Sequence, residues 1–280
     1  MTEERIHRAV SADGTEIAGR VRGQGPALVL VHGAIGDGDL AWEALLPLLT
    51  DRFACYLPST RGRGLSADNP DHSPPRLVED VTAFVDSIGE PVTLVGWSGS
   101  GAWVLGAAAA HSGSVAAVAA YEPGVISVMR EDDMARTIAT MEQMGLAAAG
   151  GRLVDAVRAF AAWVCTDDEV AALEQTDFFE RWPLAVPAML RFVQYDAAYD
   201  GPRATDPEAL AQVAAPVLVL MGKRTRLGTF FAEVAQHLAR HVPDAQVREV
   251  PGVGHFGPLL HPESIADELI TFVESVRQPA

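Results

Sequence analysis

The sequence predicts an α/β protein in which helices cover both faces of a mostly parallel central sheet. Continuous apolar runs, typical of strands buried on both faces, alternate with amphipathic helix-forming segments along the chain. The chain has 280 residues, 49% of them hydrophobic, and can therefore cover such a sheet with a layer of helices on each side. These observations favour a three-layer α/β architecture.

The expected strands begin with a hairpin. Residues 5–10 and 15–22 are joined through Asp13-Gly14, a strong hairpin turn signal. Buried strands are then expected at residues 27–31, 53–57, 92–95, 115–121 and 217–221, and a last strand is expected at residues 247–250. Helices are expected at residues 40–49, 76–89, 101–111, 229–241 and 263–277.

The alternation of strands and helices stops between Gly124 and Pro216. This part of the chain has helical periodicity, is rich in Ala and Met, and contains no convincing strand. We therefore expect a helical cap at residues 125–215, inserted into a core domain formed by residues 1–124 and 216–280.

Composition limits the function classes. A net charge of −16 argues against nucleic acid and anionic membranes as partners. Neither the basic-then-apolar layout of a signal peptide nor an uninterrupted apolar run of about 20 residues is present, which favours a cytoplasmic protein. Cys55 and Cys165 lie in apolar surroundings, and we expect both to be buried free thiols.

A serine stands between an expected strand and an expected helix. Residues 92–101 read VTLVGWSGSG, so Ser98 follows an apolar run and has small neighbours. A strand, a sharp turn with a central serine and a helix form the context of a nucleophile elbow. Ser100 occupies the last position of the G-x-S-x-G pattern and is small enough for it. The alternative is a Gly/Ser-rich turn without chemistry.

A second loop can supply part of an oxyanion hole. The segment VHGA at residues 31–34 follows the first buried strand. The backbone N–H of Ala34, paired with that of Gly99, would stabilise a tetrahedral intermediate. We expect His32 to hold this loop rather than to contact the substrate.

A general base is expected near the C-terminus. His255 lies in the glycine-rich segment PGVGHF after the last expected strand. The ordinary pKa of histidine suits proton transfer near neutrality. None of the other histidines has this setting.

The acid that orients the histidine is harder to assign. The segment GKRTR after residues 217–221 contains no Asp or Glu, and Thr225 occupies the expected position. Glu122, at the end of the preceding strand, can reach His255 from a neighbouring strand, or can merely cap the turn before Pro123. Weaker candidates are Asp196, Asp200 and Asp206.

Together these segments resemble the α/β-hydrolase superfamily. The resemblance covers nearly the whole chain: His32-Gly33, RGRGLS at residues 61–66, the Ser98 elbow and Gly254-His255. It departs from the family at Ser59, where an aspartate is usual, and at Thr225. The resemblance implies the α/β-hydrolase fold and the catalytic order Ser98, Glu122, His255.

The placement of the acid resembles that of the fungal zearalenone lactonases. They are similar in having a serine elbow, a glutamate at the same offset (122 − 98 = 24 residues) and a threonine loop where the acid is missing. This resemblance implies that Trp182 contacts the substrate. The expected substrate pocket comprises Ile35, Trp182, Phe192 and Phe256.

The sequence therefore favours a serine esterase or lactonase. The expected partner is a small hydrophobic ester, with no cofactor and no metal. Carbon–carbon bond hydrolysis, acyl transfer and a weakly catalytic, receptor-like binding protein are the alternatives. The oligomeric state is left open.

Overall fold

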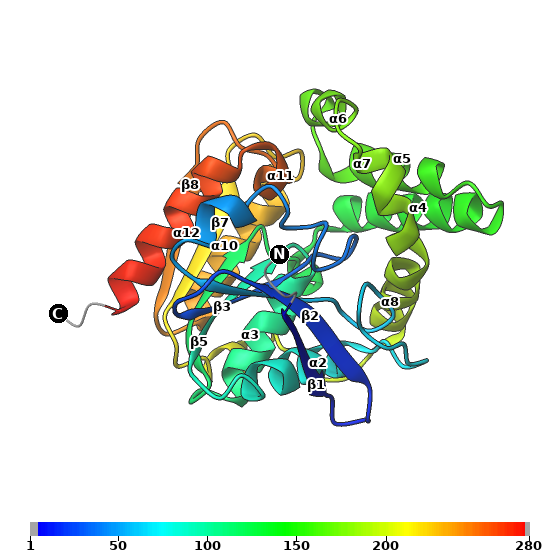
Figure 1. Ribbon diagram of the computed structural model, residues 1–280. Coiled ribbons are helices and arrows are strands. Elements are labelled where there is room, and N and C mark those ends of the chain that lie inside the picture. The colour runs from blue at the N-terminus through cyan, green and yellow to red at the C-terminus, as the bar shows by residue number, and fades with distance from the viewer. Residues whose placement is uncertain (1–4, 278–280) are drawn as a thin grey trace.

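A computed structural model describes residues 5–277 of the chain, so the ends of the expected core domain lie outside the described residues. Its centre is one eight-stranded sheet with the order β1-β2-β4-β3-β5-β6-β7-β8 (Figure 1). The strands are β1 (Arg5–Val10), β2 (Glu16–Arg22), β3 (Ala27–Val31), β4 (Ala54–Pro58), β5 (Val92–Trp97), β6 (Val115–Tyr121), β7 (Val217–Gly222) and β8 (Ala245–Val250).

The sheet is parallel from β4 to β8 and antiparallel at one edge. The hairpin β1–β2 forms as expected, and β2 pairs antiparallel with β4. The remaining neighbours pair parallel. The carboxyl ends of β3, β5, β6, β7 and β8 therefore meet at one rim, where ligands bind in open α/β sheets.

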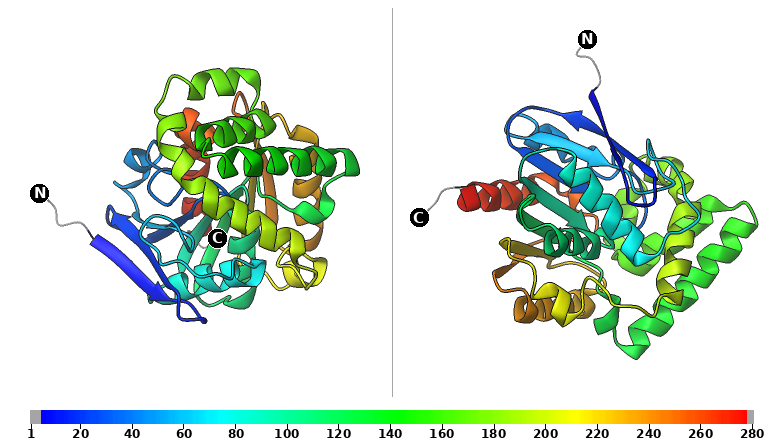
Figure 2. Two further views of the ribbon diagram at one scale, coloured as in Figure 1. Left: turned by 90° about the vertical axis from the view of Figure 1, so that its right-hand side faces the viewer. Right: turned by 90° about the horizontal axis from the view of Figure 1, so that it is seen from below.

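Helices cover both faces of the sheet (Figure 2). Side chains of alternating residues in β3 enter two separate hydrophobic clusters: Leu28 and Leu30 lie in one, and Val29 and Val31 in the other. Helices α1 (Leu46–Leu49) and α12 (Pro262–Arg277) pack into the first cluster. Helices α2 (Pro74–Asp86), α3 (Ser100–Ala110) and α10 (Gly228–His241) pack into the second. The predicted three-layer α/β fold is thereby confirmed.

One expected helix is mostly absent. The sequence predicts a helix at residues 40–49, but only Leu46–Leu49 is helical and turns precede it. The side chain of Asp37 accepts hydrogen bonds from the N–H groups of Asp39 and Leu40 and fixes the first of these turns. Pro47 lacks the N–H that a longer helix would need at that position.

The long connection between β6 and β7 is helical. Its elements are η1 (Ile126–Val128), α4 (Glu131–Ala149), α5 (Leu153–Val164), α6 (Asp167–Leu173), α7 (Phe178–Arg181), η2 (Trp182–Ala185), α8 (Val186–Ala198) and α9 (Pro207–Leu210). Helices α4 to α8 form a group beside the sheet, on the right of Figure 1. Within residues 5–277, no helix is long and apolar enough to cross a membrane. The short α11 (Gly257–Leu260) precedes the C-terminal helix.

The RGRGLS segment braces the core. The guanidinium of Arg61 is fully buried and binds Asp80 through two hydrogen bonds of 2.7 Å, with Asp13 at 2.8 Å. Ser66 Oγ donates to the carbonyl of Ser59 at 2.6 Å. Arg61 and Ser66 therefore serve the structure. The two cysteines are free and buried, as expected.

Candidate active site

The turn after β5 holds Ser98 in a strained conformation. Ser98 has φ = 56°, which is unfavourable for a residue with a Cβ atom. Its N–H donates to the carbonyl of Tyr121, and its own carbonyl accepts from the N–H groups of Gly101 and Gly124, each at 2.9 Å. Strain of this kind persists only where surrounding contacts impose it and is concentrated at functional sites.

The small residues around Ser98 have specific structural reasons. A side chain on Gly101 would clash with Pro123, so the elbow packs directly against the loop after β6. Ser100, which stands where the pattern has glycine, is buried. Its hydroxyl donates to the carbonyl of Val31 at 2.7 Å and accepts from the N–H of Trp97 at 2.8 Å. The departure from G-x-S-x-G therefore adds hydrogen bonds that hold the elbow.

The structure brings Glu122 and His255 together. Glu122 follows β6, and His255 lies in the loop between β8 and α11. The imidazole Nδ1 lies 2.7 Å from Glu122 Oε2, and both side chains are buried. The other carboxylate oxygen, Oε1, accepts the N–H of Gly222 at 3.0 Å. Glu122 is the second non-glycine residue with positive φ among residues 5–277, at 42°.

The neighbours of His255 fix its ring and its loop. Phe231 stacks on the imidazole, with a centroid distance of 5.4 Å and an interplanar angle of 12°. The indole N–H of Trp97 donates to the His255 carbonyl at 3.0 Å. Burial, and to a smaller extent the nearby carboxylates, raises the pKa of Tyr121 well above its ordinary value. Its neutral phenol donates a hydrogen bond to the carbonyl of Gly254.

The occupied Nδ1 leaves Nε2 of His255 free to face a nucleophile. Among the described residues, Ser98 Oγ makes no hydrogen bond to this imidazole. Catalytic hydrogen bonds are often long without substrate and tighten when substrate binds. The half-buried position of Ser98 at the same rim is compatible with such an approach.

The loop after β3 adjoins the elbow. A Cβ placed on Gly99 would lie 3.3 Å from Ala34 Cβ and 3.5 Å from Ala34 N, so these two residues are neighbours. His32 lies behind them: Nδ1–H donates to the Gly33 carbonyl at 2.8 Å, and Nε2 accepts the N–H of Thr60 at 3.0 Å. Burial lowers the pKa of His32 to about 3, so its imidazole is neutral. His32 therefore holds the loop.

A buried arginine outside the expected site residues supports the same loop. Arg63 Nη1 lies 3.3 Å from the Gly36 carbonyl and 3.4 Å from the Gly33 carbonyl, and Nε has no hydrogen-bond partner. Burial lowers its pKa to about 9, and repulsion from Arg191 acts in the same direction. In the sequence, only its place as the second arginine of the RGRGLS segment pointed to a structural role for Arg63.

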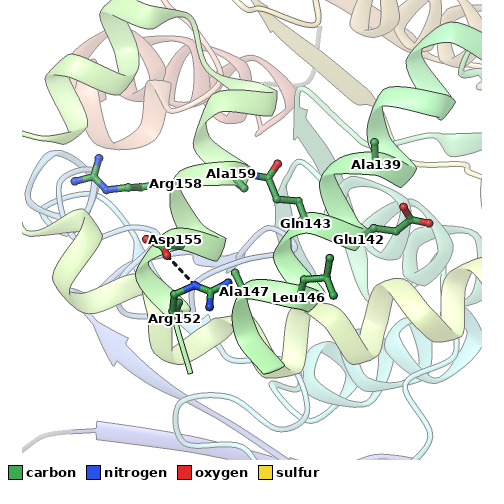
Figure 3. A pocket seen from close by; sticks show the side chains of 9 residues that line it. All are labelled: Ala139, Glu142, Gln143, Leu146, Ala147, Arg152, Asp155, Arg158 and Ala159. Atoms are coloured by element: carbon green, nitrogen blue, oxygen red, sulfur yellow. Dashed lines mark ion pairs between the residues drawn. The ribbon is translucent and has the colours of Figure 1, made fainter. Parts of the chain in front are cut away.

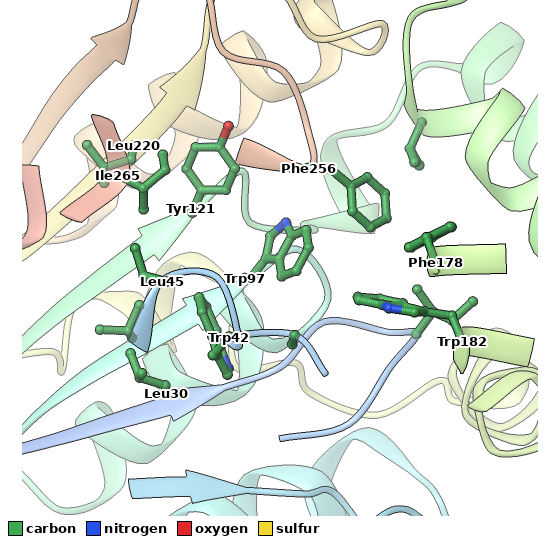
Figure 4. Close-up of a cluster of buried hydrophobic side chains, with 14 of the residues drawn as sticks. Leu30, Trp42, Leu45, Trp97, Tyr121, Phe178, Trp182, Leu220, Phe256 and Ile265 are labelled. Atoms are coloured by element: carbon green, nitrogen blue, oxygen red, sulfur yellow. The ribbon is translucent and has the colours of Figure 1, made fainter. Parts of the chain in front are cut away.

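Three of the four expected pocket residues lie in one aromatic and aliphatic cluster (Figure 4). Trp182 packs against Phe178 at 4.6 Å, Phe256 at 5.6 Å and Trp97 at 6.3 Å between ring centroids. A Cβ on Gly36 would lie 2.8 Å from the Trp182 ring, so the indole covers the loop that carries Ile35. Trp182 is only 2% exposed, so its indole is buried inside this cluster.

The fourth expected pocket residue, Phe192, lies elsewhere. Its ring packs edge-on against Trp103 at 5.3 Å, in the hydrophobic cluster on the opposite face of the sheet. Met189 and Val186, about one and two turns earlier in α8, belong to the cluster of Trp182. Phe192 therefore packs against a different cluster from Trp182, and its contact with a substrate stays a prediction.

The other expected acids make no contact with His255 in the described part of the chain. Asp196 pairs with Arg203 at 2.6 Å, and Asp206 accepts the N–H of Arg203 at 2.8 Å. Asp200 is exposed. Thr225 Oγ1 is buried without a hydrogen-bond partner. Of the acids considered, Glu122 alone contacts His255.

A separate pocket of about 720 Å³ lies between α4 and α5 (Figure 3). Its charged lining includes Glu142, Asp155, Arg152 and Arg158. None of the expected site residues lines it. Over the described part of the chain, no group of three or more His, Cys, Asp or Glu side chains is placed to hold a metal ion.

The chain belongs to the Alpha/beta hydrolase family, whose model matches residues 28–268. It is 28% identical over 264 residues to a pimeloyl-[acyl-carrier protein] methyl ester esterase of Xanthomonas campestris pv. campestris, covering 91% of this chain and 98% of the relative. It is 24% identical over 282 residues to a 2-hydroxy-6-oxo-6-(2'-aminophenyl)hexa-2,4-dienoic acid hydrolase of Metapseudomonas resinovorans, covering 96% and 91%.

The solved structures agree. An esterase from Rhodococcus sp. ECU1013 has a TM-score of 0.74 at 25% identity, covering 97% of this chain and 99% of the other. An alpha/beta hydrolase from Sphaerobacter thermophilus has a TM-score of 0.72 at 26% identity, covering 95% and 100%. The protein is therefore an α/β hydrolase, in an enzyme family that includes esterases and carbon–carbon bond hydrolases.

Proposed function

We propose that the protein is a serine hydrolase that cleaves a small hydrophobic carboxylic ester through Ser98, His255 and Glu122. The observation that carries this proposal is the 2.7 Å contact between His255 Nδ1 and Glu122 Oε2, formed at the same rim as the strained Ser98. A carboxylate at Nδ1 holds the imidazole in the tautomer whose Nε2 can accept a proton.

In the proposed reaction, Ser98 Oγ attacks the carbonyl carbon while His255 Nε2 takes its proton. The N–H groups of Ala34 and Gly99 bind the resulting oxyanion. His255 then gives its proton to the leaving alkoxide, and an acyl-enzyme on Ser98 remains. Water, deprotonated by His255, attacks the acyl carbon and releases the carboxylic acid and the free Ser98 hydroxyl.

The covering residues suggest the substrate class. We assign residues 125–215 as a cap over the core domain, with Trp182 as its contribution to the site. The rings of Trp97, Trp182 and Phe256 favour an apolar substrate. A lactone is the preferred ester because the glutamate lies 24 residues after the serine, as in the lactonases that the sequence resembles.

Carbon–carbon bond hydrolysis is the second candidate. It is favoured by the relative from Metapseudomonas resinovorans, which matches 96% of this chain. The same three residues would serve both reactions, so substrate turnover must distinguish them.

A substrate panel tests the proposal. Wild-type protein and Ser98→Ala are incubated with 4-nitrophenyl esters, medium-ring lactones and a 6-oxo-dienoic acid, with and without an added alcohol. We expect wild-type turnover of esters or lactones, loss of this turnover in Ser98→Ala, and free acid as the main product. Equal rates for the two proteins would refute the proposal, and preferential cleavage of the dienoic acid would favour the second candidate.

A further inference from the structure

A helix of the inserted segment contacts the loop that bears His255. Glu169, in the first turn of α6, points its carboxylate at this loop: Oε1 accepts the N–H of Phe256 at 3.1 Å. A Cβ on Gly254 would overlap this carboxylate, so the two chain segments are in direct contact. Glu169 therefore touches the residues on both sides of His255 in the sequence.

The Glu169 carboxylate is buried and held by polar donors rather than by a cation. It is 7% exposed, and its second oxygen accepts the N–H of Thr166 at 3.0 Å. Within residues 5–277, Glu169 forms no ion pair with a basic side chain. A carboxylate is costly to bury, and here the N–H groups of Phe256 and Thr166 offset that cost.

The neighbouring acids of α6 bind the loop that follows β7. Asp167 pairs with Arg226 and Asp168 with Arg224, and all four side chains are substantially exposed. Exposed ion pairs contribute little to stability. The buried Glu169 contact is therefore the stronger link between α6 and the catalytic rim.

The contact acts on the geometry of His255. The ring of His255 must keep Nδ1 on Glu122 and present Nε2 toward Ser98, and its direction depends on the peptide between residues 255 and 256. The Trp97 indole holds the carbonyl of this peptide, and Glu169 holds its N–H. Both polar groups of the peptide are thus fixed, one from the core and one from the inserted segment.

We propose that Glu169 is a positioning residue for His255, which couples the seating of helix α6 to catalytic competence. This inference rests on the proposed function, because it requires His255 to act as the base. When α6 is displaced, the N–H of Phe256 loses its acceptor and the imidazole is no longer held in one orientation. Misplacing a catalytic group by about 1 Å can reduce the rate about 100-fold.

The test uses three substitutions of Glu169 in the full chain. Glu169→Ala removes the acceptor, Glu169→Met removes it while keeping most of the volume, and Glu169→Gln keeps one oxygen for the N–H of Phe256. Asp168→Asn, which breaks only the adjacent exposed ion pair, is the matched control. The measurements are kcat and KM for 4-nitrophenyl butyrate, together with the thermal midpoint of each variant.

We expect kcat to fall about 10- to 100-fold in Glu169→Ala and Glu169→Met, with KM changed less than about threefold. Glu169→Gln and Asp168→Asn are expected to retain kcat within a few fold. If Glu169→Ala does not fold, Glu169→Met carries the comparison.

A kcat near wild type in the folded Met variant, or a change confined to KM, would overturn the inference. An equal loss in Glu169→Gln would also overturn it, because the acceptor is then not the cause. Wild-type turnover that Ser98→Ala abolishes is established first, so failure of the proposed function is separated from failure of this inference.

Discussion

Replacing Glu122 with glutamine tests the assignment of the acid, because glutamine keeps the shape of the side chain but cannot satisfy both contacts. One carboxylate oxygen faces His255 Nδ1 at 2.7 Å, and the other accepts the N–H of Gly222 at 3.0 Å. If the amide NH₂ faces Nδ1, the imidazole must move its proton to Nε2 and can no longer accept from Ser98. If the NH₂ faces Gly222, two donors meet in a buried site, which costs about 1–3 kcal/mol.

The expected effect of Glu122→Gln is large in either orientation. The wrong tautomer lowers kcat about 10⁴-fold in serine proteases that carry the analogous substitution. The other orientation keeps the tautomer but loses the negative charge that stabilises the imidazolium. We expect kcat to fall about 10³- to 10⁴-fold, equivalent to about 4–5.5 kcal/mol of transition-state stabilisation.

The assay compares kcat and KM of Glu122→Gln and Thr225→Ala for one 4-nitrophenyl ester. Thr225 is the control because it occupies the position where the family has its acid, yet its Oγ1 has no hydrogen-bond partner. Thr225→Ala is expected to keep kcat within about twofold, because the buried hydroxyl that it removes makes no hydrogen bond. A loss of kcat below about tenfold in Glu122→Gln, or a larger loss in Thr225→Ala than in Glu122→Gln, would show that Glu122 is not the acid.

Three further predictions concern stability. Ser98→Gly is expected to abolish turnover. Its free energy of unfolding should nevertheless be about 1 kcal/mol higher than that of Ser98→Ala, because glycine relieves the strain of φ = 56°. Equal urea midpoints for the two variants would contradict this. Arg61→Met is expected to lower the free energy of unfolding by about 3–5 kcal/mol, because it leaves the buried Asp80 carboxylate without its guanidinium. The double variant Arg61→Met, Asp80→Leu should recover part of this lost stability. A loss below about 1 kcal/mol in Arg61→Met alone would contradict the buried ion pair. Burial lowers the pKa of His32 to about 3 in the folded protein, whereas in the unfolded chain this histidine binds a proton below about pH 6.5. The free energy of unfolding therefore falls as the pH decreases from about 6.5 toward 3. Between pH 7 and pH 5 the wild type should lose about 2 kcal/mol more than His32→Asn in urea titrations, and parallel pH profiles would show that His32 is not held neutral.

The sequence predicted the sheet well because burial on both faces leaves an unambiguous pattern. Runs such as residues 27–31 and 217–221 have few polar residues, and their strands formed within a residue of the expected bounds. The helix expected at residues 40–49 failed for a local reason. Its apolar spacing was helical, but the Asp37 side chain and Pro47 favour turns, and Trp42 is buried in them.

The candidate site was only partly accessible from sequence. Because GKRTR contains no carboxylate, Glu122 was the expected acid. The carboxyl ends of parallel strands meet at one edge of the sheet, so Glu122 was expected to lie near His255. Phe192 and Glu169 could not be placed in this way. Their positions depend on how α8 and α6 pack, and Glu169 meets the N–H of Phe256 across 87 residues of sequence. No local pattern encodes such a contact.

The site and rate of phosphonate labelling test whether Glu122 acts through His255 to activate Ser98. The wild type and Glu122→Gln are treated with a fluorophosphonate, digested and analysed by mass spectrometry. Only a serine activated by a neighbouring base reacts quickly. We expect rapid modification of wild-type Ser98 alone and a labelling rate at least about 100-fold lower in Glu122→Gln. Modification of another residue, or equal rates in the two proteins, would contradict a relay from Glu122 through His255 to Ser98.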